Sequence, residues 1–386
     1  MTPLPGSLHA DDLERSREPL ARARMLPGAA YTDPEVLAWE RARVFAGGWV
    51  AVAHVSAVAE PGAQVAVALG DASAVVVRDD DGTVRAFANT CRHRGHELLP
   101  VGEAVRRPSV RCPYHGWAYD LDGRLRHATG GLEPDPVDLG LVGLRVAEHL
   151  GWVFVNADGG AAPVEEAFLG AEALLGAHDA GALVPVVRHG YTVQANWKVV
   201  HENYQECLHC PQIHPELTRM SPPDSGDNVE PGPAWVGGWM DLAPSAATMS
   251  MTGAAVAAPR PGLDEACRRR VAYVALLPSL LVSAHPDYVL THRLEPLAPD
   301  VTRITCEWLA APGTTTGDLQ PAVELWDVTN RQDWDACASV QRGLTSPWFI
   351  PGPLAPREDA VYRVVTWFSS AYLANAGPPT PGEETG

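Results

Sequence analysis

The chain of 386 residues has no long hydrophobic run. None of its apolar stretches approaches the roughly 18 residues that a membrane-spanning helix requires. Its opening stretch, MTPLPGSLHADDLERSRE, is polar and acidic, whereas a signal peptide begins with basic residues and continues with apolar ones. The sequence therefore predicts a protein without a membrane anchor or export signal, and we expect it in the cytoplasm.

Basic residues are scarce as well. Lys and Arg number 29 against 47 Asp and Glu, which gives a formal net charge of -18 at pH 7. A surface of that sign repels the phosphate backbone of nucleic acids and the headgroups of anionic lipids. We therefore expect neither nucleic acid nor a membrane surface among the partners of this protein.

Cysteine is infrequent, and the seven cysteines of the chain are an odd number. Secreted disulfide frameworks use a denser and even set, whereas intracellular thiols serve more often as metal ligands or as small buried side chains. The sequence therefore predicts no disulfides. It also lacks a Gly-rich dinucleotide fingerprint, which predicts that NAD(P)H binds to a different protein.

The composition, with 46% hydrophobic and 20% charged residues, allows a large core, and the length predicts two domains. Residues 1–44 read as an N-terminal segment and a helix, whose start is predicted by a capping box of Thr32 and Glu35 with Pro34 in the first turn. Residues 45–160 contain short strands rich in Val and Ala, separated by turn signals. This pattern predicts a small antiparallel β domain.

Residues 161–375 mix strand-like and helical patterns. Segments such as VAYVALLPSLLVSA and VTRITCEWLA predict the strands of one sheet, and two helical segments flank it, NWKVVHENYQECLH and QPAVELWDVTNRQDWDACASVQRGL. The prediction is an α+β domain in which helices flank an antiparallel sheet. The tail at 376–386 has no apolar face to bury, and we expect it to be disordered.

Two short clusters of cysteine and histidine lie within the predicted β domain. They are Cys91-x-His93 in CRHRGHELLP and Cys112-x-x-His115 in RCPYHGWAYD. A zinc ribbon is the alternative, but zinc ribbons favour Cys-x-x-Cys in both loops. The two motifs, with Gly95 shortly after the first histidine, resemble the Rieske iron–sulfur domain.

This resemblance implies a 2Fe-2S cluster in which Cys91 and Cys112 hold one iron while His93 and His115 hold the other. Imidazole ligands carry less negative charge than thiolates, so such a cluster has a higher reduction potential than an all-cysteine ferredoxin. Respiratory Rieske proteins carry an additional disulfide-forming cysteine in each loop, and neither loop has one here. The domain therefore resembles the kind found in oxygenases.

The stretch ECLHCPQIH holds two cysteines, two histidines and a carboxylate. A tetrahedral zinc site could be closed by Cys207, His209, Cys210 and His214. An oxygen-activating iron site could instead begin with Glu206, His209 and His214. The spacing resembles the acid-x-x-His-x-x-x-x-His signature of the α subunits of Rieske non-haem iron oxygenases, and this resemblance favours iron.

The same resemblance implies a mononuclear Fe(II) site in which a distant carboxylate joins His209 and His214. We predict Asp333, in NRQDWDACASVQRGL, as this third ligand. Asp335 is the competitor, but it lies two residues further on and therefore points to the opposite side of the same helix.

Glu206 has a different implied role. By resemblance it connects His209 to a Rieske histidine, His115 of the partner subunit, so that electrons cross between the subunits of a homotrimer. We expect Glu206 on the same helix face as His209. Asn203 and Tyr204, about one helical turn earlier, either reach the iron pocket or serve in packing and capping.

The resemblance is closest to the branch that includes glycine betaine, carnitine and stachydrine oxygenases. The stretches ENYQECLHCPQIHPEL, LLPSLLVSAHPDYVLTHRLEPL and DVTNRQDW carry it. It implies a catalytic domain of the helix-grip type and a terminal oxygenase component. Such a component uses Rieske-delivered electrons and O2 to hydroxylate or N-demethylate a small substrate, here a quaternary ammonium compound. A separate NAD(P)H-dependent flavin and iron–sulfur reductase, with or without a ferredoxin, would supply the electrons.

Several alternatives stay open from the sequence. Within the family, they are an aromatic-ring hydroxylating dioxygenase and an aromatic O-demethylase. Outside it, they are a Rieske electron-transfer protein without oxygenase activity and a zinc-stabilised binding module. Four tryptophans could form an aromatic cage for a methylated ammonium group, or could simply fill the core: Trp235, Trp239, Trp348 and Trp367.

Overall fold

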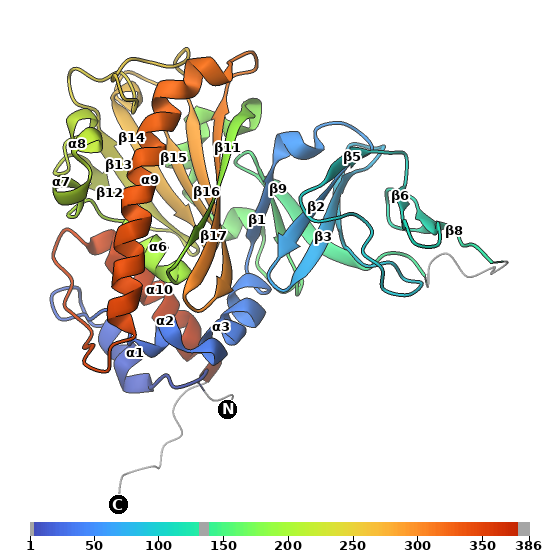
Figure 1. Cartoon of the computed structure of the whole chain (residues 1–386), viewed down its shortest axis with the longest axis horizontal. Coiled ribbons are helices and arrows are strands. Elements are labelled where there is room, and N and C mark those ends of the chain that lie inside the picture. Colours follow the sequence, from blue (N-terminus) through green and yellow to red (C-terminus); the bar gives the residue numbers. More distant parts are fainter. Residues whose placement is uncertain (1–3, 131–138, 377–386) are drawn as a thin grey trace, which may run out of the picture.

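The computed structural model describes residues 4–130 and 139–376, so nearly all of the predicted disordered tail lies outside the described residues. Figure 1 shows a smaller β domain beside a larger domain in which helices cover a sheet. An antiparallel β domain followed by an α+β domain confirms the predicted fold class. Among the described residues, no helix has both the length and the apolar character needed to cross a bilayer.

The N-terminal segment packs as short helices against the larger domain (Figure 1). The helices are α1 (Ala10–Ser16), α2 (Ala29–Thr32), α3 (Pro34–Glu40) and the π-helical turn η1 (Arg41–Phe45). The predicted capping box is wrong. Asp33 is the N-cap of α3 and accepts a hydrogen bond from the backbone N–H of Glu35, because Thr32 still belongs to α2 and donates its hydroxyl to the carbonyl of Gly28.

The β domain is built on one antiparallel sheet of seven strands. In spatial order they are β1 (Val50–His54), β10 (Trp152–Asn156), β9 (Gly143–His149), β4 (Val84–Ala88), β3 (Ala72–Arg78), β2 (Ala63–Leu69) and β5 (Ala104–Arg106). A small second sheet extends from its far end and consists of β6 (Val110–Arg111), β7 (Ala118–Tyr119) and β8 (Leu125–His127). The short helix η2 (Val55–Val58) follows β1.

The larger domain contains a second seven-stranded antiparallel sheet. Its order is β11 (Val184–Val193), β17 (Val301–Ala310), β16 (Val289–Ala298), β15 (Leu280–Ala284), β14 (Arg270–Leu276), β13 (Trp235–Asp241) and β12 (Asp227–Asn228). Short helices connect the two sheets or lie at their edges: α4 (Val164–Ala167), α5 (Glu172–Leu175), η3 (Gly176–His178), η4 (Ala180–Ala182) and η5 (Cys267–Arg269).

Five helices complete the larger domain: α6 (Trp197–Tyr204), α7 (Cys210–Ile213), α8 (Pro215–Met220), α9 (Thr316–Leu344) and α10 (Asp359–Ala376). Helix α9 runs across the sheet in Figure 1 and starts with a capping box between Thr315 and Asp318. Its inner face buries residues such as Leu325 and Trp326 against the sheet. This packing sets the rotation of α9, and therefore which of its polar side chains turn inward.

A buried polar cluster ties α3, α6 and α10 together. The carboxylate of Glu40 accepts hydrogen bonds from Lys198 Nζ at 2.5 Å, from the indole N–H of Trp197 at 2.8 Å and from the hydroxyl of Tyr372. The side chains of Lys198 and Glu40 are 0% and 1% exposed. Because a buried charge without a partner is costly, this cluster holds α6 in one position relative to its neighbours.

Candidate metal centres and active site

The two Cys–His loops of the β domain have the same backbone design. In each, the cysteine carbonyl accepts a hydrogen bond from a glycine N–H four residues later, Gly95 for Cys91 and Gly116 for Cys112. Both glycines have positive φ, 74° and 78°, a conformation that residues with a side chain rarely adopt. Each cysteine therefore begins a tight turn of the same backbone conformation, and a histidine follows within each turn.

The loops bring the four predicted cluster ligands together as two unlike pairs. Cys91 and Cys112 are each 2% exposed, and burial raises the pKa of the Cys112 thiol, whose side chain lies within hydrogen-bond reach of Cys91. The imidazole rings of His93 and His115 lie further out, with their centroids 4.7 Å apart. An inner thiol pair and an outer imidazole pair fit the donor set of a Rieske 2Fe-2S cluster.

Two aromatic residues that the sequence analysis did not single out support these ligands. The ring of Trp117 stacks on His93 with centroids 4.8 Å apart and an angle of 6° between the planes. The hydroxyl of Tyr119 lies 3.2 Å from Cys91 Sγ. Both residues follow the second loop directly, so their position next to the motif was the signal that could have identified them.

A second group of ligands gathers between α7, α8 and α9. Ligand atoms of His209, His214 and Asp333 all lie within 4.8 Å of one another. Asp333 Oδ1 is 2.9 Å from His214 Nε2 and 3.4 Å from His209 Nε2. Asp335, the competing carboxylate, is exposed. Two imidazoles and one carboxylate are the donor set of the facial triad that holds non-haem Fe(II).

Both histidines of this group have a hydrogen-bond partner behind them. His209 Nδ1 lies 2.5 Å from Glu206 Oε1, and His214 Nδ1 lies 2.7 Å from Gln332 Oε1. Acceptors at Nδ1 hold the proton there and leave Nε2 free for a metal. Against the effect of burial, the two nearby carboxylates raise the pKa of His209 to about 9, so the site favours a positive charge.

Asn203 reaches this group, which is one of the two roles that the sequence left open for it. Its side-chain amide donates to Asp333 Oδ1 at 3.2 Å. Tyr204 points toward the sheet instead, where its hydroxyl lies 3.0 Å from Ser283 Oγ, although it also lines the neighbouring cavity. Gln332 was missed by the sequence analysis, and its place directly before Asp333 was the available signal.

The local structure around Glu206 differs from the prediction. Helix α6 ends at Tyr204, so Glu206 and His209 do not share a helix face. Glu206 lies in a turn instead, where its carboxylate accepts from the backbone N–H groups of Leu208 and His209. The prediction of no disulfides is also wrong, because this turn places Cys207 and Cys210 together with Cα atoms 4.9 Å apart, and they form a disulfide.

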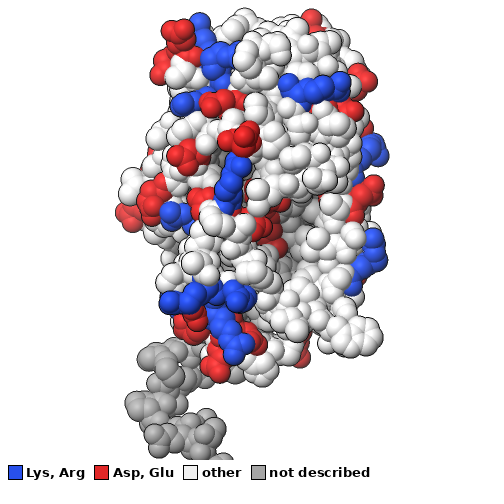
Figure 2. All heavy atoms as spheres, turned by 90° about the vertical axis from the view of Figure 1, so that its left-hand side faces the viewer, with Lys and Arg blue, Asp and Glu red and all other residues white. Residues whose placement is uncertain are grey.

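A cavity of about 380 Å³ opens beside the His209, His214 and Asp333 group. Figure 2, which faces this side of the larger domain, shows a hollow with acidic side chains in its walls. Charged residues along the cavity include Asp227, Asp359 and Arg357. Its aromatic walls are Tyr204, Trp239, Tyr273, Trp326 and Trp334.

The four tryptophans considered for an aromatic cage do not come together. Trp239 lines the cavity, and the guanidinium of Arg270 lies over its ring at 4.6 Å. Trp235 is buried and donates its indole N–H to a backbone carbonyl, and Trp348 is 85% exposed. The fourth, Trp367, donates to the carbonyl of Pro233. The aromatic wall therefore depends mainly on residues from β14 and α9, which the sequence analysis did not select.

Comparison with protein families gives two matches. The Rieske [2Fe-2S] domain matches residues 48–133, and the ring hydroxylating alpha subunit (catalytic domain) matches residues 180–374. The second match alone covers half of the chain. The two matched ranges contain the two groups of ligands described above.

Among curated proteins, the glycine betaine monooxygenase oxygenase subunit of Chromohalobacter salexigens is 29% identical over an alignment 397 positions long, which covers 92% of this chain and 87% of the relative. The carnitine monooxygenase oxygenase subunit of Escherichia coli K12 is 39% identical over 197 residues, which cover 49% of this chain and 52% of that protein. Both relatives are oxygenase subunits.

Solved structures show the same architecture. The quaternary ammonium Rieske monooxygenase CntA in complex with L-carnitine superposes with a TM-score of 0.79 at 25% identity, covering 95% of this chain and 99% of that one. Naphthalene 1,2-dioxygenase from Rhodococcus sp. superposes with a TM-score of 0.77 at 20% identity, which indicates a shared fold.

Proposed function

The chain belongs to the ring-hydroxylating α subunit family, and from that premise we propose that it oxidises a small quaternary ammonium compound at an N-methyl carbon. It is an oxygenase subunit with a Rieske domain and a catalytic domain of the mononuclear iron type. The observation that carries the substrate class is the cavity beside the His209, His214 and Asp333 group, where aromatic and acidic side chains favour a cation.

The described residues fit both metal groups of the family. Cys91, Cys112, His93 and His115 would hold the 2Fe-2S cluster. His209, His214 and Asp333 would hold Fe(II), in a site that already favours a cation. When bound, the cluster supplies single electrons and the ferrous ion activates oxygen next to a substrate C–H bond.

The surrounding residues have separable tasks in this proposal. Asn203 holds Asp333 through its amide donor, and Gln332 fixes the tautomer of His214. Faces of the aromatic side chains along the cavity attract the methylated ammonium group. A hydroxylated N-methyl carbon then breaks down to formaldehyde and a demethylated amine, so the cavity needs no further acid or base for this last step.

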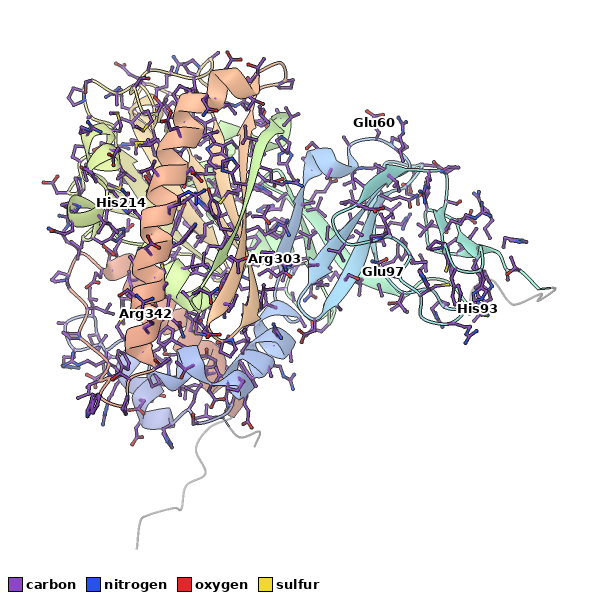
Figure 3. The ribbon with its side chains drawn as sticks, in the orientation of Figure 1. Glu60, His93, Glu97, His214, Arg303 and Arg342 are labelled. Atoms are coloured by element: carbon purple, nitrogen blue, oxygen red, sulfur yellow. A yellow bond between two sulfur atoms is a disulfide. The ribbon has the colours of Figure 1, made fainter. Side chains whose placement is uncertain are left out.

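Electron delivery is proposed to cross between subunits of a homotrimer. Figure 3 shows His93 at the outer tip of the β domain, well separated from His214 on the opposite side of the chain. A single chain therefore does not bring its own cluster site next to its own mononuclear site. Glu206, hydrogen-bonded to His209, would accept a second hydrogen bond from His115 of the partner subunit. The structure of a quaternary ammonium Rieske monooxygenase that is 25% identical to this chain has given insight into inter-subunit electron transfer in that protein.

Family oxygenase subunits receive electrons from a reductase. We propose that the reductase here is a separate NAD(P)H-dependent flavin and iron–sulfur protein, with or without a ferredoxin. Arg94 is exposed within the first cluster loop and gives this loop a positive charge on a chain whose net charge is -18. A negatively charged electron donor would be attracted to such a loop.

Metal analysis and a substrate screen test the proposed function. An oxygenase should contain about three irons and about two acid-labile sulfides per chain, a pure electron carrier about two irons, and a binding module zinc without sulfide. Oxygen uptake should then be coupled to formaldehyde release with glycine betaine or carnitine-like amines. Stoichiometric product from aromatic acids, without formaldehyde from any quaternary amine, would favour the aromatic alternatives.

The substitution Glu206→Gln tests the bridge between subunits. It keeps the size of the side chain but removes its charge, so assembly, iron content and the Rieske spectrum should stay unchanged while electron transfer between the two sites slows by orders of magnitude. Rapid mixing of the reduced protein with oxygen and substrate measures the single-turnover rate. A wild-type rate in this variant, or in a verified monomer, would contradict the bridge.

A further inference from the structure

The disulfide between Cys207 and Cys210 encloses the metal-binding turn. His209 is one of the two residues between the bridged cysteines, and Glu206 directly precedes them. Both cysteines line the cavity that opens next to the His209, His214 and Asp333 group. The disulfide is therefore part of the active-site wall and not a remote link between surface segments.

Cys210 has the closer position to the metal ligands. Its Sγ lies 3.8 Å from His209 Nε2, the ring atom that faces the carboxylate of Asp333. A thiolate and an imidazole bound to one metal at the usual distances of about 2.3 and 2.1 Å are separated by about 3–3.6 Å. The distance of 3.8 Å is close to this range, and the Cys210 side chain is buried at 4% exposed.

We propose that Cys210 is a latent protein ligand of the mononuclear metal, released when the Cys207–Cys210 disulfide is reduced. The inference rests on the metal site proposed for His209, His214 and Asp333. In the disulfide, the sulfur carries no ionisable proton and is a poor ligand. As a thiolate, it is a soft, charged donor next to a metal that otherwise has imidazole and carboxylate ligands.

The reaction balances with a dithiol as reductant. The S–S bond of Cys207 and Cys210 accepts two electrons and two protons, while the dithiol loses both and closes its own disulfide. The free Cys210 thiol gives its proton to solvent when its sulfur binds the metal. A thiolate in this position occupies one of the places that the facial triad leaves open for oxygen or substrate, so reduction should lower turnover reversibly.

A purely structural disulfide is the alternative, and two matched substitutions separate it from the proposal. Cys207→Ser and Cys210→Ser both remove the covalent link from the turn. A structural link predicts the same consequences for both variants. A latent ligand predicts opposite ones, because Cys207→Ser leaves the Cys210 thiol free at all times, whereas Cys210→Ser removes the ligand.

The experiment uses the whole protein with its Rieske cluster and with Co2+ in place of the mononuclear iron. Difference spectra are taken between samples with and without Co2+, with the cluster in the same reduced state in both. We expect visible Co2+ bands without a sulfur-to-cobalt charge-transfer band in the disulfide form. The charge-transfer band should appear in the wild type after dithiol treatment and in Cys207→Ser without treatment, but never in Cys210→Ser.

A second readout does not require any variant to fold. After dithiol treatment of the wild type, alkylation with iodoacetamide is measured by peptide mass spectrometry with and without Co2+. Co2+ should lower the labelling of Cys210 and leave the labelling of Cys207 unchanged. Labelling of Cys210 that does not change with Co2+, or identical spectra for the two serine variants, would overturn the latent ligand. Absence of visible Co2+ bands in every sample would instead overturn the metal site itself, so the two failures are distinguishable.

Discussion

Glu202 allows a quantitative prediction about pH and stability. It lies on α6 next to Asn203, is buried, and accepts a hydrogen bond from the hydroxyl of Tyr31 at 2.7 Å. Burial raises the pKa of Glu202 to about 8, although the hydrogen bond from Tyr31 and the charge of Lys198 act in the opposite direction. The folded state therefore keeps a proton on this carboxyl at pH values where the unfolded chain has lost it.

The sign and size of the effect follow from proton linkage. Between the ordinary pKa of 4.5 and the folded value of about 8, the native state binds more protons than the unfolded state, so this group makes stability fall as pH rises. From pH 6 to pH 8 the loss is about 2 kcal/mol, since one pKa unit corresponds to about 1.4 kcal/mol and the titration levels off near pH 8. Glu202→Gln mimics the protonated form and should lose this dependence.

Thermal unfolding of the wild type and of Glu202→Gln at pH 6 and pH 8 measures this pH dependence of stability. The change in unfolding midpoint between the two pH values is determined for each protein, and the two changes are subtracted. The contributions of all other titrating groups, which the two proteins share, cancel in this difference. For a domain of this size, about 2 kcal/mol corresponds to a difference of about 4–8 °C in the midpoint. Tyr31→Phe removes a hydrogen bond that lowers the pKa of Glu202, so in this variant the loss of stability should extend to a higher pH than in the wild type. Equal pH shifts in wild type and Glu202→Gln would refute the reasoning.

Three further perturbations have defined outcomes. Gln332→Leu removes the acceptor behind the second histidine of the proposed metal site and should weaken metal binding by about 10–100-fold in a titration, with an unchanged Rieske spectrum. Lys198→Met leaves the buried carboxylate of Glu40 without its cation and should destabilise the catalytic domain by about 3–5 kcal/mol; adding Glu40→Gln should recover part of this loss, and no recovery would contradict the pairing. Gly226→Ala places a Cβ 1.8 Å from a backbone carbonyl oxygen at a φ of +80° and should lower the unfolding midpoint clearly more than Gly82→Ala, which also has positive φ but meets nothing within 4 Å.

The sequence alone determined the features that are encoded over a few residues. Spacing within CRH, CPYH and ECLHCPQIH identified the candidate ligands, because loop ligands of one metal group lie close together along the chain. The alternation of short strands and long helical segments indicated the fold class, and the ligand motifs indicated the family; both are confirmed. Helix periodicity also predicted that Asp333 and Asp335 point to opposite sides of one helix, whereas the choice of Asp333 as the inward residue rested on the resemblance to the family.

Tertiary structure decided what depends on contacts between distant segments. Tyr273 and Trp326 line the cavity only because β14 and α9 pack together, and no local pattern marks them. The buried pair of Lys198 with Glu40 joins residues far apart in the sequence. The disulfide between Cys207 and Cys210 joins residues close in sequence, but it forms only because α6 ends at Tyr204 and the chain turns after it. The sequence pattern did not predict this helix end. Such endings are set by packing and by capping contacts, which intrinsic helix propensity is too weak to determine.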